Sequence, residues 1–180
     1  MIEEDQYRTL YERVGDLIGW DFSSIQVQVE GAEWDFYAEV TDKCAPDSVL
    51  LDIGTGGGER LSTITPQVQQ AIGIDQSPAM VKTARRKHPQ DQWETLHFAN
   101  MNARQLAFAS QRFDVISCRH SSFDPQEIAR VLNRGGWFLT QQVGEADKRN
   151  IKQAFGRGQS YGEQDGDTMH TYAAALELAG

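Results

Sequence analysis

The chain has 180 residues, of which 39% are hydrophobic, and this is enough for one ordinary globular domain with a buried core. Its formal net charge of −9 at pH 7 argues against unaided binding to nucleic acid or to an anionic membrane, because both would repel it. No apolar run approaches the ~20 residues of a membrane span, and the acidic N-terminus is the reverse of a signal peptide. Cys44 and Cys118 have neither metal-ligand nor disulfide spacing, so we expect a reduced, cytoplasmic protein without a metal site.

The first part of the chain, residues 1–45, is predicted to be a helical segment that precedes the main domain. Apolar and aromatic residues recur at helical spacing from Glu4 to Ile18, and Gly19 ends that helix. A second helix around residues 34–40 must stop before Pro46, because proline disfavours helical geometry for the residue ahead of it. We expect the aromatic residues of this segment to close over a ligand as a lid, unless they simply pack the core.

From Ser48 onward, short apolar runs alternate with helix signals. Five runs predict strands, at residues 49–53, 70–74, 95–99, 113–117 and 137–143. This alternation predicts an α/β domain over residues 46–180, a doubly wound, Rossmann-like parallel sheet with helices on both faces. Ser77 and Asp124 each precede a proline and predict helix N-caps, the second with Glu127 three residues later, and Gly135 predicts a helix end.

The strongest chemical signal lies where the first of these strands ends. Residues 49–53 run straight into a glycine-rich turn, Gly54-Thr55-Gly56-Gly57-Gly58, in which the backbone can approach a nucleotide-like ligand closely. Such turns also occur in ordinary strand-to-helix connections. The acid Asp75 at the end of the second strand favours the binding site, because a carboxylate there accepts hydrogen bonds from both hydroxyls of a ribose.

The glycine spacing argues against two common nucleotide sites. A dinucleotide fingerprint needs a glycine where this chain has Glu59, and a P-loop needs a Gly-Lys-Ser or Gly-Lys-Thr that is missing. The run from Asp52 to Gly58 instead resembles the first motif of the class I S-adenosylmethionine-dependent methyltransferase family. The resemblance extends from about Val49 to Val143, with the later motifs in family order.

The resemblance implies S-adenosyl-L-methionine as cofactor and assigns residues to it. Asp75 would hold the ribose, and Asn102 would face the adenine in place of the usual acid, while Asp52 would lie under the amino acid portion. The full set of implied cofactor contacts is Asp52, Gly54, Thr55, Gly56, Gly58, Asp75, Gln76, Met80, Met101, Asn102, Ala103 and Cys118.

The resemblance also implies an activity, namely methyl transfer to an acceptor by in-line displacement. Arg119 and His120 would point toward the acceptor, and His120 is the candidate general base by position, although it can equally be a surface histidine. Signatures for amino-group and metal-dependent acceptors are missing, which leaves a small molecule as the predicted acceptor. The alternatives are an RNA methyltransferase that works with a partner, and a non-catalytic cofactor-binding or interaction module.

The end of the chain raises one further expectation. Members of the family finish the sheet with an antiparallel strand pair, but here the predicted helix 168–178 is followed only by Ala179 and Gly180. The last pair is therefore expected to be absent, which leaves residues 137–143 as a sheet edge. Exposed edges recruit other strands, so we expect self-association into a homo-oligomer there, or cover by the C-terminal segment.

Overall fold

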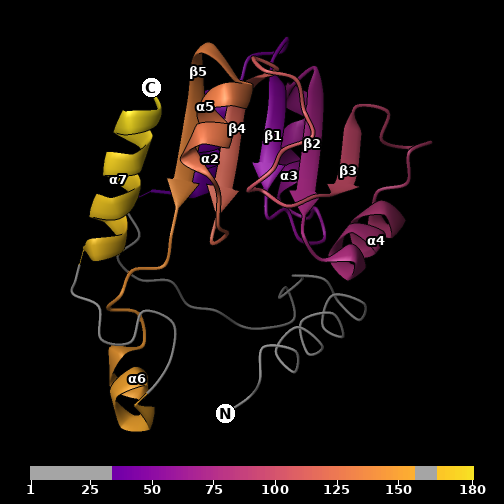
Figure 1. Cartoon of the computed structure of the whole chain (residues 1–180). Coiled ribbons are helices and arrows are strands. Elements are labelled where there is room, and N and C mark those ends of the chain that lie inside the picture. Colours follow the sequence, from indigo (N-terminus) through magenta and orange to yellow (C-terminus); the bar gives the residue numbers. More distant parts are fainter. Residues whose placement is uncertain (1–33, 157–165) are drawn as a thin grey trace.

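The computed structural model describes residues 34–156 and 166–180 (Figure 1). The predicted helix at 4–18, and with it most of the predicted lid, lies outside the described residues. The described elements are, in chain order, α2 (Phe36–Asp42), β1 (Val49–Ile53), α3 (Leu61–Ile64), the 3₁₀ turn η1 (Thr65–Gln67), β2 (Gln70–Asp75), α4 (Pro78–Lys87), β3 (Leu96–Asn100), β4 (Phe113–Arg119), α5 (Pro125–Val131), β5 (Leu132–Gln141), α6 (Arg149–Phe155) and α7 (Asp167–Ala179).

The five strands form one sheet in the order β3-β2-β1-β4-β5, and every neighbouring pair is parallel. The arrows in Figure 1 accordingly all point the same way. All five residues of the central strand β1 are buried, which is why that strand appears in the sequence as an unbroken apolar run that ends in an acid. The chain leaves β1 for β2 on one side and returns to β4 on the other. The strand order therefore reverses beside β1, where sheets of this class bind ligands at the carboxyl ends of their strands.

Two separate apolar clusters cover the two faces of the sheet. Side chains of α2, α3 and α4 pack with Leu50 and its neighbours on one face, whereas α5 and α7 pack with Leu51 and its neighbours on the other. In Figure 1, α5 lies in front of the sheet and α2 and α3 lie behind it. Successive residues of a strand point to opposite faces, so adjacent leucines serve different layers. The predicted doubly wound class is confirmed.

The strand β5 departs from the prediction at its start. The glycine pair was expected to end a helix, but α5 ends at Val131 and the strand begins at Leu132. Between the pairs Phe113↔Leu132 and Val115↔Trp137, the register advances two residues on β4 and five on β5. The glycines thus form a bulge inside the strand. A Cβ on Gly136 would lie 2.7 Å from the Asp114 carbonyl oxygen, so glycine is required by the close approach of β4.

The last described helix, α7, packs against the face of the sheet that α5 covers. Its Tyr172 ring stacks on Phe123 with a centroid distance of 4.6 Å, and Phe123 in turn contacts Phe138 of β5 edge-on. Among the described residues, β5 is one of the two edge strands of the sheet, and β3 is the other. Self-association through this edge stays a prediction. Within the described ranges, no helix combines the length and the hydrophobicity that crossing a bilayer would require.

Two glycines with the same backbone conformation allow a test of the tight packing around the glycine loop. Gly58 and Gly135 both have φ of 77°, but a Cβ on Gly58 would lie 2.7 Å from Cε1 of Phe98, whereas nothing lies within 4 Å of one on Gly135. We expect Gly58→Ala to lower the free energy of unfolding by about 1–3 kcal/mol more than Gly135→Ala, because only the first overpacks the core. Urea unfolding of both variants measures the difference. Equal losses would show that backbone conformation alone requires glycine at position 58.

Candidate functional site

The predicted site residues meet at the carboxyl ends of four neighbouring strands. Ile53 of β1 pairs with Ile74 of β2 and with Cys118 of β4, so the glycine loop begins level with Asp75 on one side and Arg119 on the other. Asp75 pairs in turn with Asn100 of β3, which places the segment around Asn102 next in line. Segments between residues 52 and 120 therefore meet at the carboxyl end of the sheet.

Most backbone amides of the glycine loop donate to acceptors within the protein. Gly54 and Thr55 both donate to the Ile74 carbonyl oxygen, at 2.9 and 3.0 Å, and Gly58 donates to Thr55 at 3.1 Å. Gly54, Gly56 and Gly58 adopt positive φ, which allows this tight winding. A loop that cradles phosphate presents its amides to the ligand. This loop uses them internally, so its construction suits a nucleoside without a pyrophosphate.

Asp75 is the acid that ties the loop to the next helix. Its carboxylate is buried and accepts hydrogen bonds from Gly56 N at 3.0 Å and from Ser77 N at 2.8 Å. Ser77 caps α4 as predicted, through Met80 N. The Asp75 carboxylate thus connects the glycine loop to the start of α4.

Asp52 lies beneath the loop as a second buried acid, only 2% exposed. The Ser117 hydroxyl donates to its Oδ1 at 2.7 Å. Burial raises the pKa of Asp52 from 3.8 to about 6. The nearby hydroxyls of Ser117 and Thr55 act in the opposite direction and lower this pKa. Thr55 Oγ1 is itself buried and has no hydrogen-bond partner of standard geometry. Near neutral pH the site therefore contains a negative charge that a cationic ligand would stabilise.

The segment that follows β4 passes close to the start of the glycine loop. A Cβ on Gly54 would lie 2.8 Å from Ser121 Oγ, so Gly54 is required by this approach, a contact that no sequence signal indicated. Cys118 is buried and its thiol donates to the Ser121 carbonyl oxygen at 3.2 Å. Burial raises the pKa of Cys118 to about 12, so the thiol stays protonated and is a poor nucleophile.

His120 follows at the rim of the site, with an exposed side chain and a φ of 54°. Its backbone amide donates to Gln141 at 2.8 Å, which continues the β4–β5 ladder past the left-handed residue. Partial burial of the ring and the Arg119 charge lower the pKa of His120 below its usual value of 6.5. The imidazole is therefore neutral at pH 7 and able to accept a proton.

The remaining predicted contacts differ in accessibility. Gln76 and Asn102 are exposed, Met101 and Ala103 are half-buried, and Met80 is fully buried in the structure. Asn102 Oδ1 already accepts a hydrogen bond from Arg104 N at 2.9 Å, which closes a turn in its own segment. Ligand contacts from these residues stay predictions.

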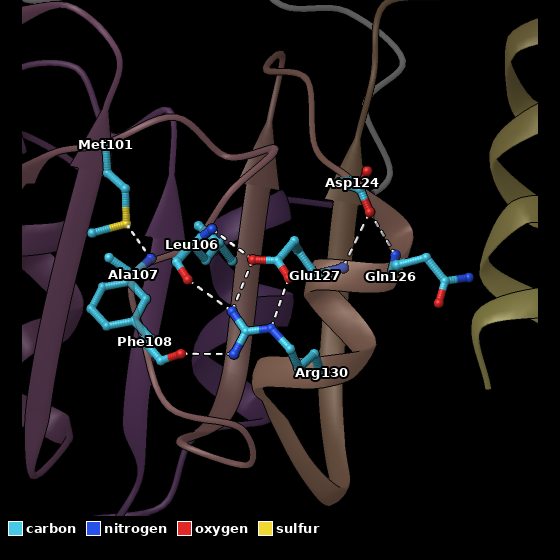
Figure 2. Close-up of polar contacts among 8 residues, drawn as sticks. All are labelled: Met101, Leu106, Ala107, Phe108, Asp124, Gln126, Glu127 and Arg130. Carbon is cyan, nitrogen blue, oxygen red and sulfur yellow. Dashed lines mark hydrogen bonds and ion pairs between the residues drawn. The ribbon is translucent and has the colours of Figure 1, made fainter.

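The segment after Asn102 is clamped by a pair of charged residues on α5 (Figure 2). Arg130 donates to the carbonyl oxygens of Leu106 and Phe108 at 2.8 and 2.7 Å, while Glu127 accepts from Leu106 N at 2.6 Å and pairs with Arg130 at 2.7 Å. Asp124 was expected to cap this helix, with Glu127 three residues later. Asp124 does cap α5, through the amides of Gln126 and Glu127, but the Glu127 side chain turns to the loop instead.

Within the described part of the chain, no group of three or more His, Cys, Asp or Glu side chains is placed to hold a metal ion.

Comparison with known proteins identifies the family. A family model described as a methyltransferase domain matches residues 51–140, half of the chain. The chain belongs to this methyltransferase family. The match covers β1 to β5 and includes the glycine loop and Asp75, so the resemblance drawn from the sequence motifs is confirmed.

Individual relatives agree with this assignment. The chain is 33% identical over 106 residues to a Bacillus subtilis (strain 168) protein named uncharacterized methyltransferase YcgJ, which covers 55% of this chain and 42% of the relative. The crystal structure of YcgJ superposes with a TM-score of 0.54 at 32% identity, over 57% of this chain and 47% of that one. Demethylmenaquinone methyltransferase of Bacteroides fragilis is 30% identical over 116 residues, 59% of this chain and 47% of the relative.

A more distant structure shares the fold alone. Geranyl diphosphate C-methyltransferase from Streptomyces coelicolor, solved with S-adenosyl-L-homocysteine, has a TM-score of 0.52 at 19% identity, over 58% of this chain and 41% of that one. The chain spans about half the length of the curated relatives it matches.

The buried acid Asp52 predicts a pH dependence of stability. Its pKa is raised on folding, so the stability it contributes is present below pH 4 and is lost as pH rises through about 6. A rise of about two units corresponds to about 3 kcal/mol. We expect the wild-type protein to lose up to this amount relative to Asp52→Asn between pH 4 and pH 7, measured by urea unfolding. Parallel pH profiles for the two proteins would contradict the raised pKa.

Proposed function

We propose that this chain is an S-adenosyl-L-methionine-dependent methyltransferase acting on a small-molecule acceptor. The observation that carries the proposal is the inward-turned glycine loop joined to the buried Asp75 carboxylate, within the fold of the methyltransferase family. Such a loop suits a nucleoside cofactor without phosphates, and Asp75 has acceptor sites for ribose hydroxyls. NAD and FAD need a loop that offers free amides to a pyrophosphate.

Each side chain of the site has a task in this reaction. When bound, S-adenosyl-L-methionine supplies a sulfonium whose methyl group passes to the acceptor while the sulfur keeps the bonding electron pair. Asp75 accepts hydrogen bonds from the ribose, Asn102 lies on the adenine side, and Asp52 offers negative charge near the amino acid portion. Most of the acceleration comes from alignment, and His120 removes a proton where the nucleophile carries one.

The relatives support a small-molecule acceptor. The demethylmenaquinone methyltransferase of Bacteroides fragilis acts, by its name, on a quinone-type molecule. The acidic composition of this chain agrees with such an acceptor, because its net charge of −9 repels nucleic acid. Salt-sensitive RNA binding by the purified protein would instead favour the RNA alternative.

Cofactor binding tests the proposal directly. Calorimetric titration should show binding of S-adenosylhomocysteine to the wild-type protein and none of NADH. Asp75→Asn should lower the affinity at least tenfold, because it removes charge-assisted hydrogen bonds worth ~1.5–3 kcal/mol each.

A matched control is Asp114→Asn, at the opposite end of the sheet. Asp114 also anchors a backbone amide, that of Val49 at 2.8 Å, but it lies away from the site. This variant should bind S-adenosylhomocysteine as the wild-type protein does. No binding to the wild-type protein would contradict the proposed function, and unchanged binding to Asp75→Asn would contradict the ribose contact.

The role of His120 is tested by His120→Asn, since asparagine tolerates the left-handed backbone of this position. If His120 is the general base, turnover of a phenolic or quinol acceptor should fall roughly a hundredfold with cofactor affinity unchanged. His170→Ala on α7 is the control and should keep full turnover. Full turnover by His120→Asn would leave alignment alone as the mechanism.

A further inference from the structure

A glutamine directly after β5 holds the turn that follows β4. The side-chain nitrogen of Gln142 donates to the Ser121 carbonyl oxygen at 2.9 Å and to the Thr140 hydroxyl at 2.8 Å. The Thr140 hydroxyl in turn donates to the Cys118 carbonyl oxygen at 2.9 Å. Two half-buried side chains at the end of β5 therefore hold both ends of the segment 118–121.

The direction of these hydrogen bonds follows from the chemistry of the groups. A carbonyl oxygen cannot donate, so the nitrogen of the Gln142 side chain, and not its oxygen, must face Ser121. The Thr140 hydroxyl uses its one proton for Cys118 and accepts from Gln142. The Cys118 thiol also donates to the Ser121 carbonyl oxygen, but a thiol is a weak donor. The two N–H groups of Gln142 are therefore what an apolar side chain of similar size cannot replace.

The segment between these two anchors contains a residue in an unfavourable backbone conformation. His120 has a φ of 54°, in the left-handed region that disfavours residues with a Cβ. Such a conformation persists only where neighbouring contacts determine it, and residues of this kind concentrate at functional sites. The His120 amide donates to Gln141 at 2.8 Å, and the anchors at Cys118 and Ser121 hold the chain on either side of it.

The same segment lies against the start of the glycine loop. Cys118 pairs with Ile53, the last residue of β1. A Cβ on Gly54 would lie 2.8 Å from Ser121 Oγ, so the Ser121 side chain approaches the loop closely. His120 lies between these two contacts in the chain, and its side chain is exposed. A shift of the segment would therefore move the imidazole relative to the glycine loop.

We propose that Gln142 is a positioning residue that, through Ser121 and Thr140, fixes His120 at the rim of the site. The part of His120 in the reaction rests on the proposed function, whereas the conformation that Gln142 imposes does not. A general base acts only while its nitrogen stays within hydrogen-bond reach of the proton that it removes. Loss of Gln142 should therefore lower turnover and leave the affinity for the nucleoside unchanged.

The experiment compares Gln142→Leu with Gln90→Leu as the matched control. Gln90 also closes a turn with its side-chain nitrogen, which donates to the carbonyl oxygens of Trp93 and Glu94 at 2.9 and 3.1 Å. It lies between α4 and β3, at the amino end of β3 and away from the site. Thr140→Val removes the second hydroxyl link, and Thr140→Ser keeps it.

The first measurement needs no methyl acceptor. Amide hydrogen exchange followed by NMR should show the His120 amide exchanging roughly tenfold faster in Gln142→Leu than in the wild type, because the segment opens more often. Thr140→Val should also exchange faster, while Thr140→Ser and Gln90→Leu should stay within about twofold of the wild type. Unchanged exchange in Gln142→Leu would overturn the inference. An equal acceleration at Leu51 in β1 would show a loss of overall stability alone and would overturn it as well.

The second measurement asks whether Gln142 acts through His120. With 1,4-naphthohydroquinone as the acceptor probe, Gln142→Leu should lower kcat roughly tenfold and keep the Kd of S-adenosylhomocysteine within about twofold. The double variant with His120→Asn should be no slower than His120→Asn alone, because position matters only while the base is present. Losses that multiply in the double variant, or an equal loss of cofactor affinity, would overturn the positioning role.

Failure of this inference is distinguishable from failure of the proposed function. Wild-type protein that binds no S-adenosylhomocysteine contradicts the proposed function, and the exchange of the His120 amide then still decides whether Gln142 holds the segment. Wild-type protein that binds S-adenosylhomocysteine, with His120 exchange the same in Gln142→Leu and Gln90→Leu, keeps the proposed function and removes the positioning role. If the naphthohydroquinone is not methylated, the exchange measurement decides alone.

Discussion

The pair of hydrogen bonds that the Asp75 carboxylate accepts from Gly56 and Ser77 is the constraint on which the site depends. One buried charge at the end of β2 fixes the turn that leaves β1 and also the start of α4. The amides of Gly54 and Thr55 donate to β2, that of Gly56 to Asp75 and that of Gly58 back to the loop, and the glycines allow the backbone to fold that tightly. A loop of the same composition with outward amides would be a phosphate site. Whether such a loop suits a ligand with phosphates or a nucleoside without them therefore depends on the direction in which its backbone amides point.

Charge is distributed unevenly along the edge of the sheet. Two buried acids, Asp52 and Asp75, lie at the carboxyl ends of β1 and β2, whereas the guanidinium groups of Arg60 and Arg119 each lie near the Tyr37 ring. Burial raises the pKa of Asp52 to about 6, and the proximity of Asp75 acts in the same direction. A ligand with a cationic centre next to a ribose would complement the two acids, because its positive charge would meet their negative charges. The protein alone holds the pattern at some electrostatic cost, which such a ligand would relieve.

The sequence was most informative where one physical pattern determines one element. The apolar run ending in Asp52, the acid Asp75 at the next strand end and the Ser77 cap are local signals, and the structure has each element where the pattern predicts it. The prediction was wrong for the start of β5, because a glycine pair marks a bulge as readily as a helix end and only pairing with β4 distinguishes them. The approach of Ser121 to Gly54 and the convergence on Tyr37 depend on contacts between distant segments, which no periodicity encodes.

The Glu127–Arg130 pair of α5 shows how a helix on one face of the sheet supports a loop beside the site. That segment carries Asn102, yet it has little regular structure of its own between β3 and β4. Arg130 and Glu127 satisfy two of its carbonyl oxygens and one of its amides, so the loop is held by a helix whose own position is fixed by Ile128 and Val131 in the core. An ion pair this exposed contributes little to stability by itself. Its three hydrogen bonds to the backbone instead reduce the number of conformations open to the loop, and a loop with fewer conformations loses less entropy when it closes on a ligand.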